Sequence, residues 1–189
     1  MQALLHTIRQ CRICEAHIEP RPVLSVHPDS RLLLIGQAPG TRVHATGIPW
    51  NDPSGDNLRA WMGLDKAQFY DVERIAIMPM GFCYPGKGRS GDLPPRPECA
   101  PQWHAAVLEH MPHIELTILI GQYAQAYYLK EKKKGSLTET VAAFQEYLPA
   151  FLPLPHPSPR NRLWMRNNPW FLETVVPVLQ HRIQQLLSP

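Results

Sequence analysis

The chain has 189 residues, 44% of them hydrophobic, and a formal net charge of +3. This length suits one compact domain over residues 1–189, because domains cluster near roughly 100 to 150 residues. No stretch approaches the ~20 apolar residues of a membrane span, and the start MQALLHTIRQC lacks a basic region followed by a long apolar run. We therefore expect a cytoplasmic protein without a membrane partner. The small positive charge permits binding to a polyanion without demonstrating it.

Four short apolar runs alternate with helical patterns along the chain. The runs are RLLLI (31–35), RIAIM (74–78), LTILI (116–120) and LPAFLPL (about 148–154), each typical of a strand buried on both faces. Helices are predicted over residues 55–62, 98–111, 123–129, 137–146 and 169–187. This alternation predicts an α/β fold, with a mostly parallel sheet covered by helices on both faces. Ligands of such sheets bind beyond the carboxyl ends of the strands, which directs attention to the loops at 36–56, 79–99 and 155–161.

The first loop, GQAPGTRVHATGIPWNDPSGD, combines a tight turn with an aromatic residue and two carboxylates. In the turn Gly36–Gly40, which includes Ala38 and Pro39, backbone amides can approach a ligand closely. Trp50 supplies a flat apolar surface, and Asp52 and Asp56 supply carboxylates. A base pocket needs an aromatic face for stacking and a polar group that positions water. The alternative is an ordinary strand-exit turn, with Ser54 as a helix cap and Asp56 as a solvated acid of the first helical turn.

The last loop is His156-Pro157-Ser158-Pro159-Arg160-Asn161. Its alternate prolines hold His156, Ser158 and Arg160 in extended backbone at the edge of the sheet. A lone histidine is usually structural. A histidine presented between prolines, with serine, arginine and asparagine close behind, is better explained as part of a site for an anion or phosphate.

The four cysteines form two pairs. Two residues separate Cys11 from Cys14, and fifteen separate Cys83 from Cys99. Without a secretory signal, these are expected to be reduced thiols or metal ligands rather than disulfides. Three interpretations remain: buried thiols with an accidental CxxC, a zinc site, and an iron–sulfur cluster. The long second spacing disfavours zinc, which prefers two close pairs, whereas a cluster held by four thiolates accepts it.

Together and in this order, these motifs resemble the iron–sulfur branch of the uracil-DNA glycosylase superfamily. The CxxC pair resembles the first ligand pair of that branch, and Cys83, PGKGRSGDLPPRPE and Cys99 resemble the second. GQAPG and HPSPRN resemble its two active-site motifs. The resemblance implies a three-layer α/β/α domain with a central parallel four-stranded sheet, one structural [4Fe-4S] cluster, and a pocket for an extruded base.

The resemblance also implies roles for individual residues. The turn Gly36–Gly40 would contact the base through backbone groups, and Trp50 would stack on it. His156 would donate a hydrogen bond to the departing base. Ser158 would hold a flanking phosphate, and the loop at 159–161, with Arg160 and Asn161, would push into the duplex.

Hydrolysis requires a group that orients water and stabilises a cationic sugar. The segment NDPSGD resembles the subgroup of the family that carries its catalytic carboxylate at this point. Asp52 is therefore the first candidate and Asp56 the second. Gln37 is uncharged, so it could position water but would not stabilise a cation comparably.

One position departs from the family. Many relatives carry an asparagine that reads uracil four residues before the third cysteine, and this chain has Pro79, which has neither an amide side chain nor an N–H. We expect a monomeric, monofunctional glycosylase that acts on damaged DNA, with uracil as the first substrate and hypoxanthine or xanthine as alternatives. The competing hypotheses are a non-catalytic DNA-binding protein of the same fold and, last, an unrelated α/β enzyme that acts on a free nucleotide.

Overall fold

Four parallel strands form a single sheet in the computed structural model, which describes residues 1–89 and 91–188. The strands are β1 (Leu32–Ile35), β2 (Ile75–Ile77), β3 (Leu116–Ile120) and β4 (Phe151–Leu154), in the spatial order β2-β1-β3-β4. All three neighbouring pairs are parallel. The predicted parallel four-stranded sheet is thus confirmed.

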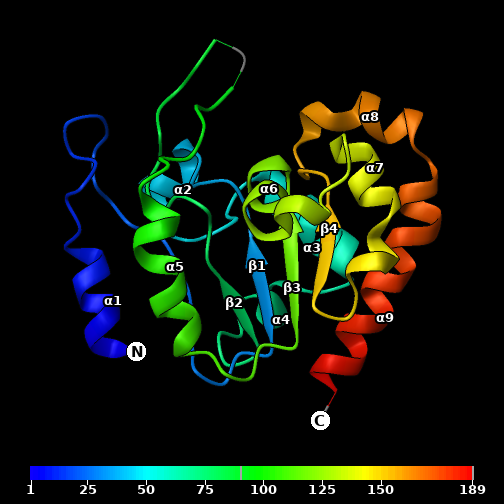
Figure 1. Cartoon of the computed structure of the whole chain (residues 1–189), viewed down its shortest axis with the longest axis horizontal. Helices are drawn as coiled ribbons and strands as arrows, with labels where there is room; N and C mark the ends of the chain where they lie inside the picture. The colour runs from blue at the N-terminus through cyan, green and yellow to red at the C-terminus, as the bar shows by residue number, and fades with distance from the viewer. Residues whose placement is uncertain (90, 189) are drawn as a thin grey trace.

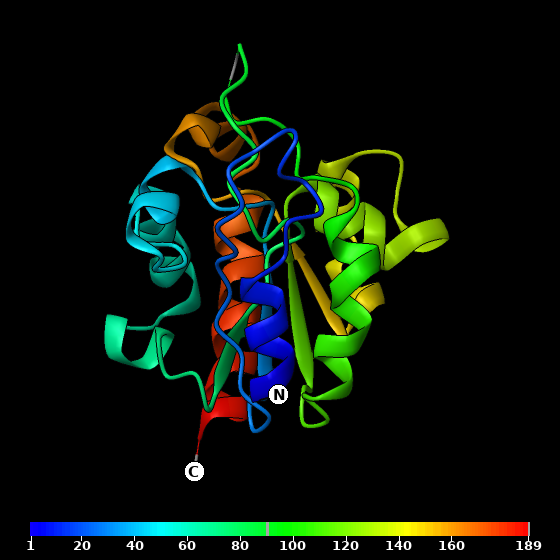
Figure 2. The ribbon, with the colours of Figure 1, turned by 90° about the vertical axis from the view of Figure 1, so that its left-hand side faces the viewer.

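Helices cover both faces of this sheet, as Figures 1 and 2 show. They are α1 (Gln2–Arg9), α2 (Thr41–Thr46), α3 (Pro53–Met62), α4 (Lys66–Phe69), α5 (Cys99–Glu109), α6 (Gln122–Leu129), α7 (Leu137–Ala142), α8 (Arg162–Asn167) and α9 (Val176–Leu187). Short 3₁₀ turns lie at η1 (Lys130–Lys132), η2 (Phe144–Tyr147) and η3 (Pro159–Asn161), and a π-helical turn at η4 (Phe171–Val175). None of the helices in the described ranges is both long and apolar enough to span a membrane.

Successive side chains of each strand point to opposite faces of the sheet, and the buried side chains therefore form two cores, one on each face. Leu32 and Leu34 of β1 pack with residues of α3, α4, α7 and α9, whereas Leu33 and Ile35 pack with α1, α5 and α6. The division arises because successive side chains of a strand point to opposite faces. A strand buried on both faces must be apolar throughout, which is why β1 and β3 appear as continuous apolar runs. The structure is therefore the expected three-layer α/β/α sandwich.

Element boundaries differ from the sequence predictions where proline or short helices intervene. The helix predicted over 137–146 ends at Ala142 and continues as η2, and the helix predicted over 169–187 begins with the π-helical turn η4. Pro177, in the first turn of α9, lacks the N–H that a regular ladder would use. Strand β4 begins at Phe151 instead of 148, after Pro149. The short helices α1, α2, α4 and α8, of four to eight residues, were not predicted.

The parallel arrangement brings the carboxyl ends of all four strands to one edge, the upper edge in Figure 1. The loops after β1, β2 and β4 leave the sheet there. The outer edge of β2 is covered by an extended segment in which Ser25 exchanges two backbone hydrogen bonds with Ile77, of 2.9 and 2.6 Å. This pairing closes a strand edge that would otherwise be open.

Candidate active site

A cavity of about 410 Å³ lies at the carboxyl ends of the strands. Most of its walls come from the three loops that the sequence singled out, and Val23 and Ile77 add to them from outside these loops. The predicted site residues that line it are Gly36, Gln37, Ala38, Pro39, Gly40, Trp50, Asp52, Ser54, His156, Ser158 and Arg160. Asp56 and Asn161 do not line it. The sequence reasoning missed Asp92 and Gly91, and it also missed the apolar walls Val23, Val43, Pro49 and Ile77.

Trp50 is held against the turn by an unusual backbone conformation. Its φ is 56°, in the left-handed region that bulky residues rarely adopt. A Cβ on Gly36 would lie 2.7 Å from the Trp50 ring atom Cζ2, and one on Gly55 would lie 1.8 Å from the Trp50 carbonyl oxygen. Both glycines are therefore needed for this placement. Arg59 Nη1 donates to the Trp50 carbonyl at 3.3 Å, and the Tyr70 hydroxyl donates to the Pro49 carbonyl at 2.8 Å.

The two oxygens of Asp52 serve different neighbours. Oδ1 accepts a hydrogen bond of 2.9 Å from the Gly55 N–H and so caps α3. Oδ2 lies 3.9 Å from the position that a Cβ on Gly40 would occupy, which places it beside the glycine-rich turn. The helix start thus fixes the carboxylate while one oxygen remains directed at the cavity.

Asp56 points away from the cavity. Its Oδ1 accepts a hydrogen bond of 2.6 Å from Nη2 of Arg59, whose side chain is buried although that of Asp56 is 69% exposed. Arg59 also lies over the Phe69 ring, 5.3 Å from its centroid. Asp56 therefore neutralises the buried arginine that braces the Trp50 turn.

His156 lies beside Trp50 and carries its proton on one defined nitrogen. The ring centroids are 5.7 Å apart, with 38° between the planes. Nδ1 accepts a hydrogen bond of 3.2 Å from the Ser158 N–H, so a neutral ring has its proton on Nε2. Burial lowers the pKa of His156, and the nearby charge of Asp52 opposes this effect. The imidazole is therefore a neutral donor near pH 7.

Two asparagine amides hold the loop that carries His156. Nδ2 of Asn57, on α3, donates to the Pro157 carbonyl at 2.8 Å. Nδ2 of Asn161 donates to the His156 carbonyl at 2.7 Å. The amide of Asn161 therefore helps to hold the loop that is predicted to enter the duplex.

The loop after β2 also reaches the cavity. Pro79 lines the wall at its start, and the Pro79 carbonyl accepts a hydrogen bond of 3.1 Å from Nε2 of the buried His104. Farther along, the Leu93 carbonyl accepts a hydrogen bond of 3.1 Å from Nε2 of Gln37. This bond ties the loop to the first turn and brings Asp92 to the cavity mouth. The available sequence signal was the position of Asp92 in the loop at 79–99, which follows a predicted strand.

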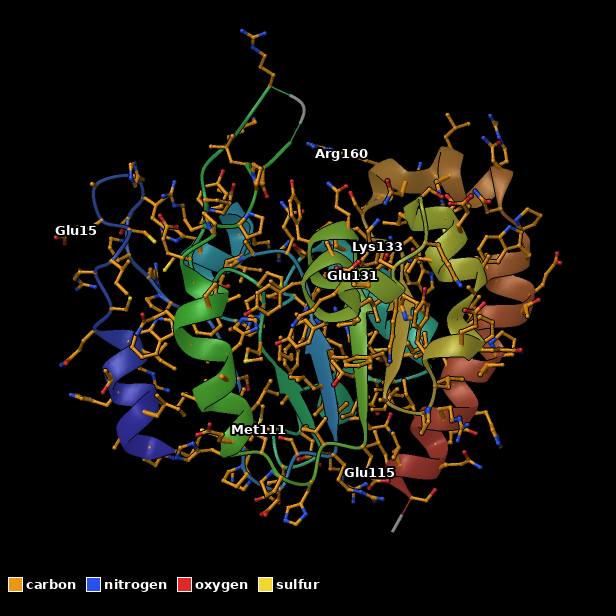
Figure 3. The ribbon with its side chains drawn as sticks, in the orientation of Figure 1. Glu15, Met111, Glu115, Glu131, Lys133 and Arg160 are labelled. Carbon is orange, nitrogen blue, oxygen red and sulfur yellow. The ribbon has the colours of Figure 1, made fainter. Side chains whose placement is uncertain are left out.

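Arg160 spans the opening of the cavity. Its backbone N–H donates to Ser158 Oγ at 3.2 Å, and its Nη1 lies 3.0 Å from the position of a Cβ on Gly91. Figure 3 shows the Arg160 side chain extending from η3 toward the loop that precedes α5. The Arg160 guanidinium therefore reaches from the loop after β4, on one side of the opening, to Gly91 in the loop after β2, on the other.

The four cysteines line one small hollow between the N-terminal segment and the start of α5. None of the four forms a disulfide. The Phe82 N–H donates to Cys99 Sγ at 3.3 Å, and the Cys14 thiol donates to Oε2 of Glu98 at 3.8 Å. Without a metal, burial raises the pKa of Cys83 to about 11 and that of Cys99 to about 12. The hollow therefore gathers four sulfur donors, and the Phe82 N–H would stabilise a thiolate at Cys99.

The arrangement of these four cysteines bears on which metal group they could hold. Within residues 1–89 and 91–188, no three His, Cys, Asp or Glu side chains are grouped so that they could hold a metal ion. A single zinc would need its sulfurs about 2.3 Å from one centre. A cluster with several irons spreads its four thiolates over different metal atoms. Four cysteine thiolates are the donor set that such a cluster takes.

Residues 25–180 match the family model of the Uracil DNA glycosylase superfamily. This match contains all four strands and every residue that lines the cavity except Val23. Among solved structures, the chain is similar to a protein from Methanosarcina acetivorans, studied by solution NMR and described as a "putative Uracil DNA glycosylase". The identity is 16% and the TM-score 0.49, over 86% of this chain and 97% of that chain.

Proposed function

Because the chain belongs to the uracil DNA glycosylase superfamily, we propose that it hydrolyses the N-glycosidic bond of a deaminated base in DNA and leaves an abasic site. The observation that carries this proposal is the meeting of Trp50, Asp52 and His156 in one cavity. These residues supply a stacking surface, a carboxylate and a neutral hydrogen-bond donor. Each corresponds to a separate requirement of the reaction.

The cavity suits an extruded base. Its volume of about 410 Å³ falls in the range of ligand pockets, roughly 300 to 1,000 Å³. The target bond is inaccessible inside a stacked duplex, so the nucleotide must rotate out of the helix before the reaction. Trp50 then stacks on the base, and the backbone of the turn Gly36–Gly40 contacts it.

In the reaction, the bond between the sugar carbon C1′ and the base nitrogen breaks, and its electron pair leaves with the base. Asp52 Oδ2 positions water and stabilises the cationic sugar. The water oxygen then bonds to C1′, and the proton that water loses balances the charge of the departing base. His156 donates its Nε2 proton in a hydrogen bond to that base, while its Nδ1 accepts the hydrogen bond from the Ser158 N–H.

The product is an abasic site without strand cleavage. Among the described residues that line the cavity there is no lysine, the usual nucleophile for a covalent imine with the sugar. One chain supplies every group used in this scheme, so a monomer suffices. Its partner is DNA that contains a damaged base.

Pro79 bears on the choice of base. It lines the cavity without an amide side chain, and its carbonyl already accepts the bond from His104. The edge of a base at this wall therefore contacts the apolar ring of Pro79 instead of an amide. The cavity should then discriminate less strongly between uracil and other deaminated bases. Uracil is the first substrate to test, and hypoxanthine and xanthine are the alternatives.

We further propose that Cys11, Cys14, Cys83 and Cys99 hold a [4Fe-4S] cluster, which would staple the N-terminal segment to the loop before α5 when bound. The convergence of the four thiols on one hollow supports this assignment. None of them lines the cavity, so the role is structural. Anaerobically purified protein should be brown and contain iron and sulfide, and a colourless, fully active protein would contradict the assignment.

The deciding experiment measures base release from oligonucleotides that contain uracil, hypoxanthine or xanthine, read as strand breaks after alkaline treatment. Asp52→Ala and His156→Ala should each lower the rate at least about 10²-fold on the preferred substrate, the usual loss when one stabilising group is removed. DNA binding without release from any substrate would instead indicate a non-catalytic DNA-binding protein. Turnover of a free nucleotide would indicate the third hypothesis.

A further inference from the structure

Asp92 is carried to the cavity by a narrow hairpin in the loop between β2 and α5, which rises above the strand ends in Figure 1. Gly88 N–H donates to the Gly91 carbonyl at 2.6 Å, and Leu93 N–H donates to the Gly86 carbonyl at 2.9 Å. Lys87 and Asp92 form an isolated antiparallel bridge. The bond from Gln37 to the Leu93 carbonyl then ties this hairpin to the first turn. The position of Asp92 is therefore fixed by contacts on both sides.

The carboxylates of Asp92 and Asp52 face the same point from two different loops. Oδ2 of Asp92 lies 3.4 Å, and Oδ2 of Asp52 3.9 Å, from the position that a Cβ on Gly40 would occupy. Gly40 has no side chain, so both oxygens can approach the turn. Both residues also line the cavity.

This proximity has an electrostatic cost. Burial against the cavity wall raises the pKa of Asp92, the charge of Asp52 raises it further, and Arg160 and Lys87 act in the opposite direction. Two like charges beside one turn destabilise the free protein. Positive charge that develops between them during a reaction would remove that repulsion, and such arrangements concentrate at active sites.

We infer that Asp92 is a second catalytic carboxylate, which acts with Asp52 to stabilise the cationic sugar as the base departs. The inference rests on the proposed glycosylase function. Asp92 forms no bond in the reaction: the base leaves with the electron pair of the C1′–N bond, and water supplies the oxygen that C1′ gains. Asp92 neither gains nor loses a proton in the step, and the charge of its ionised form lowers the energy of the state in which C1′ is most positive.

The test compares the native protein with Asp92→Asn, Asp92→Ala and Glu173→Gln in single-turnover base release, together with DNA affinity and thermal melting. Glu173 is an exposed carboxylate of η4 and serves as the charge-matched control. Both Asp92 variants should lose about 10-fold or more in rate, with no loss of DNA affinity and no fall in melting temperature. Glu173→Gln should match the native protein in all three measurements.

A pH series adds a readout that a structural role would not affect. The charged and titratable groups around Asp92 are Asp52, Arg160, Lys87 and His156. The ratio of native to Asp92→Asn rates cancels the common contributions of these groups. The ratio should fall toward one as pH decreases through the titration of Asp92, because a protonated carboxyl no longer stabilises a cation.

Two failures are distinguishable. If the native protein releases no base from any substrate, the proposed function and this inference both fail. If the native protein is active and both Asp92 variants equal it, only the inference fails. A loss of rate accompanied by an equal loss of DNA affinity would also overturn the inference. Asp92 would then maintain the structure of the hairpin and would not stabilise the cationic sugar.

Discussion

The indole ring of Trp50 lies directly against the Cα of Gly36, where an added Cβ would come within 2.7 Å of Cζ2. The surface proposed for base stacking therefore exists only because the turn has no side chain at this position. The left-handed backbone conformation of Trp50 further restricts the positions that its ring can take.

Gly36→Ala should displace the Trp50 ring and lower base release by about 10-fold, with a loss of about 1 to 3 kcal/mol in stability from overpacking. Tryptophan fluorescence, read as the difference from a Trp50→Phe variant, follows the ring. Gly40→Ala is the matched comparison, because its Cβ would meet Asp92 at 3.4 Å and no atom of Trp50 within 4 Å. An unchanged Trp50 signal in Gly36→Ala would show that the contact does not position the ring.

Substitution should distinguish Asp52 from Asp56, the two candidates for the catalytic carboxylate in the first loop. Asp52→Asn retains a side chain that caps helices well but removes the charge, so base release should fall by about 10²-fold with little loss of stability. Asp56→Asn should keep native activity and lose about 1 kcal/mol of stability, because buried Arg59 loses a largely exposed partner. Base release and urea unfolding measure the two effects, and the reverse pattern of activities would reassign the catalytic carboxylate.

Stability should decrease in mildly acidic solution because of His104. This side chain is 1% exposed, with Nε2 3.1 Å from the Pro79 carbonyl and Nδ1 2.6 Å from the Tyr128 hydroxyl. Burial lowers its pKa from 6.5 to about 4. Between these values the unfolded chain binds a proton that the folded chain does not, so the free energy of unfolding falls as pH decreases.

The loss attributable to His104 should approach about 3 kcal/mol near pH 4, and none should be present above pH 6.5. Urea unfolding at several pH values measures it. The lowered pKa of His156 acts in the same direction, so the contribution of His104 is the part that disappears in His104→Gln. His181→Gln, at an exposed position of α9, is the control. Equal pH dependence in native protein and His104→Gln would contradict the assignment.

Arg160 should contribute to DNA affinity through phosphate. It lies at the cavity mouth and beside the hairpin that carries Asp92. If it neutralises one phosphate, Arg160→Ala should weaken binding and reduce the slope of log K against log salt by about 0.9. Lys66→Ala, on α4, which contributes no residue to the lining of the cavity, should leave the slope unchanged. Equal slopes for native protein and Arg160→Ala would place Arg160 outside the phosphate contacts.

Continuous apolar runs made the fold predictable. A strand buried on both faces requires apolar residues throughout, so the runs that became β1 and β3 could be recognised without coordinates. The helix boundaries were less accessible. The division of 137–146 into α7 and η2 depends on how Val141, Phe144 and Tyr147 pack against the sheet, and local propensity does not record that packing.

The sequence by itself determined the four strands and the helices α3, α5, α6, α7 and α9 that alternate with them or follow them, and it directed attention to the loops from which the cavity is built. Parallel strands place their carboxyl ends together, so the loops that follow them must meet. Only the tertiary structure decided which side chains of those loops face inward. Asp52 and Asp56 stand four residues apart on one helix start, yet the cap at Gly55 keeps Asp52 at the turn, whereas Arg59 draws Asp56 outward. Asp92 reaches the cavity through the bond between Gln37 and Leu93, residues 56 positions apart, and spacing along the chain contains no record of such a contact.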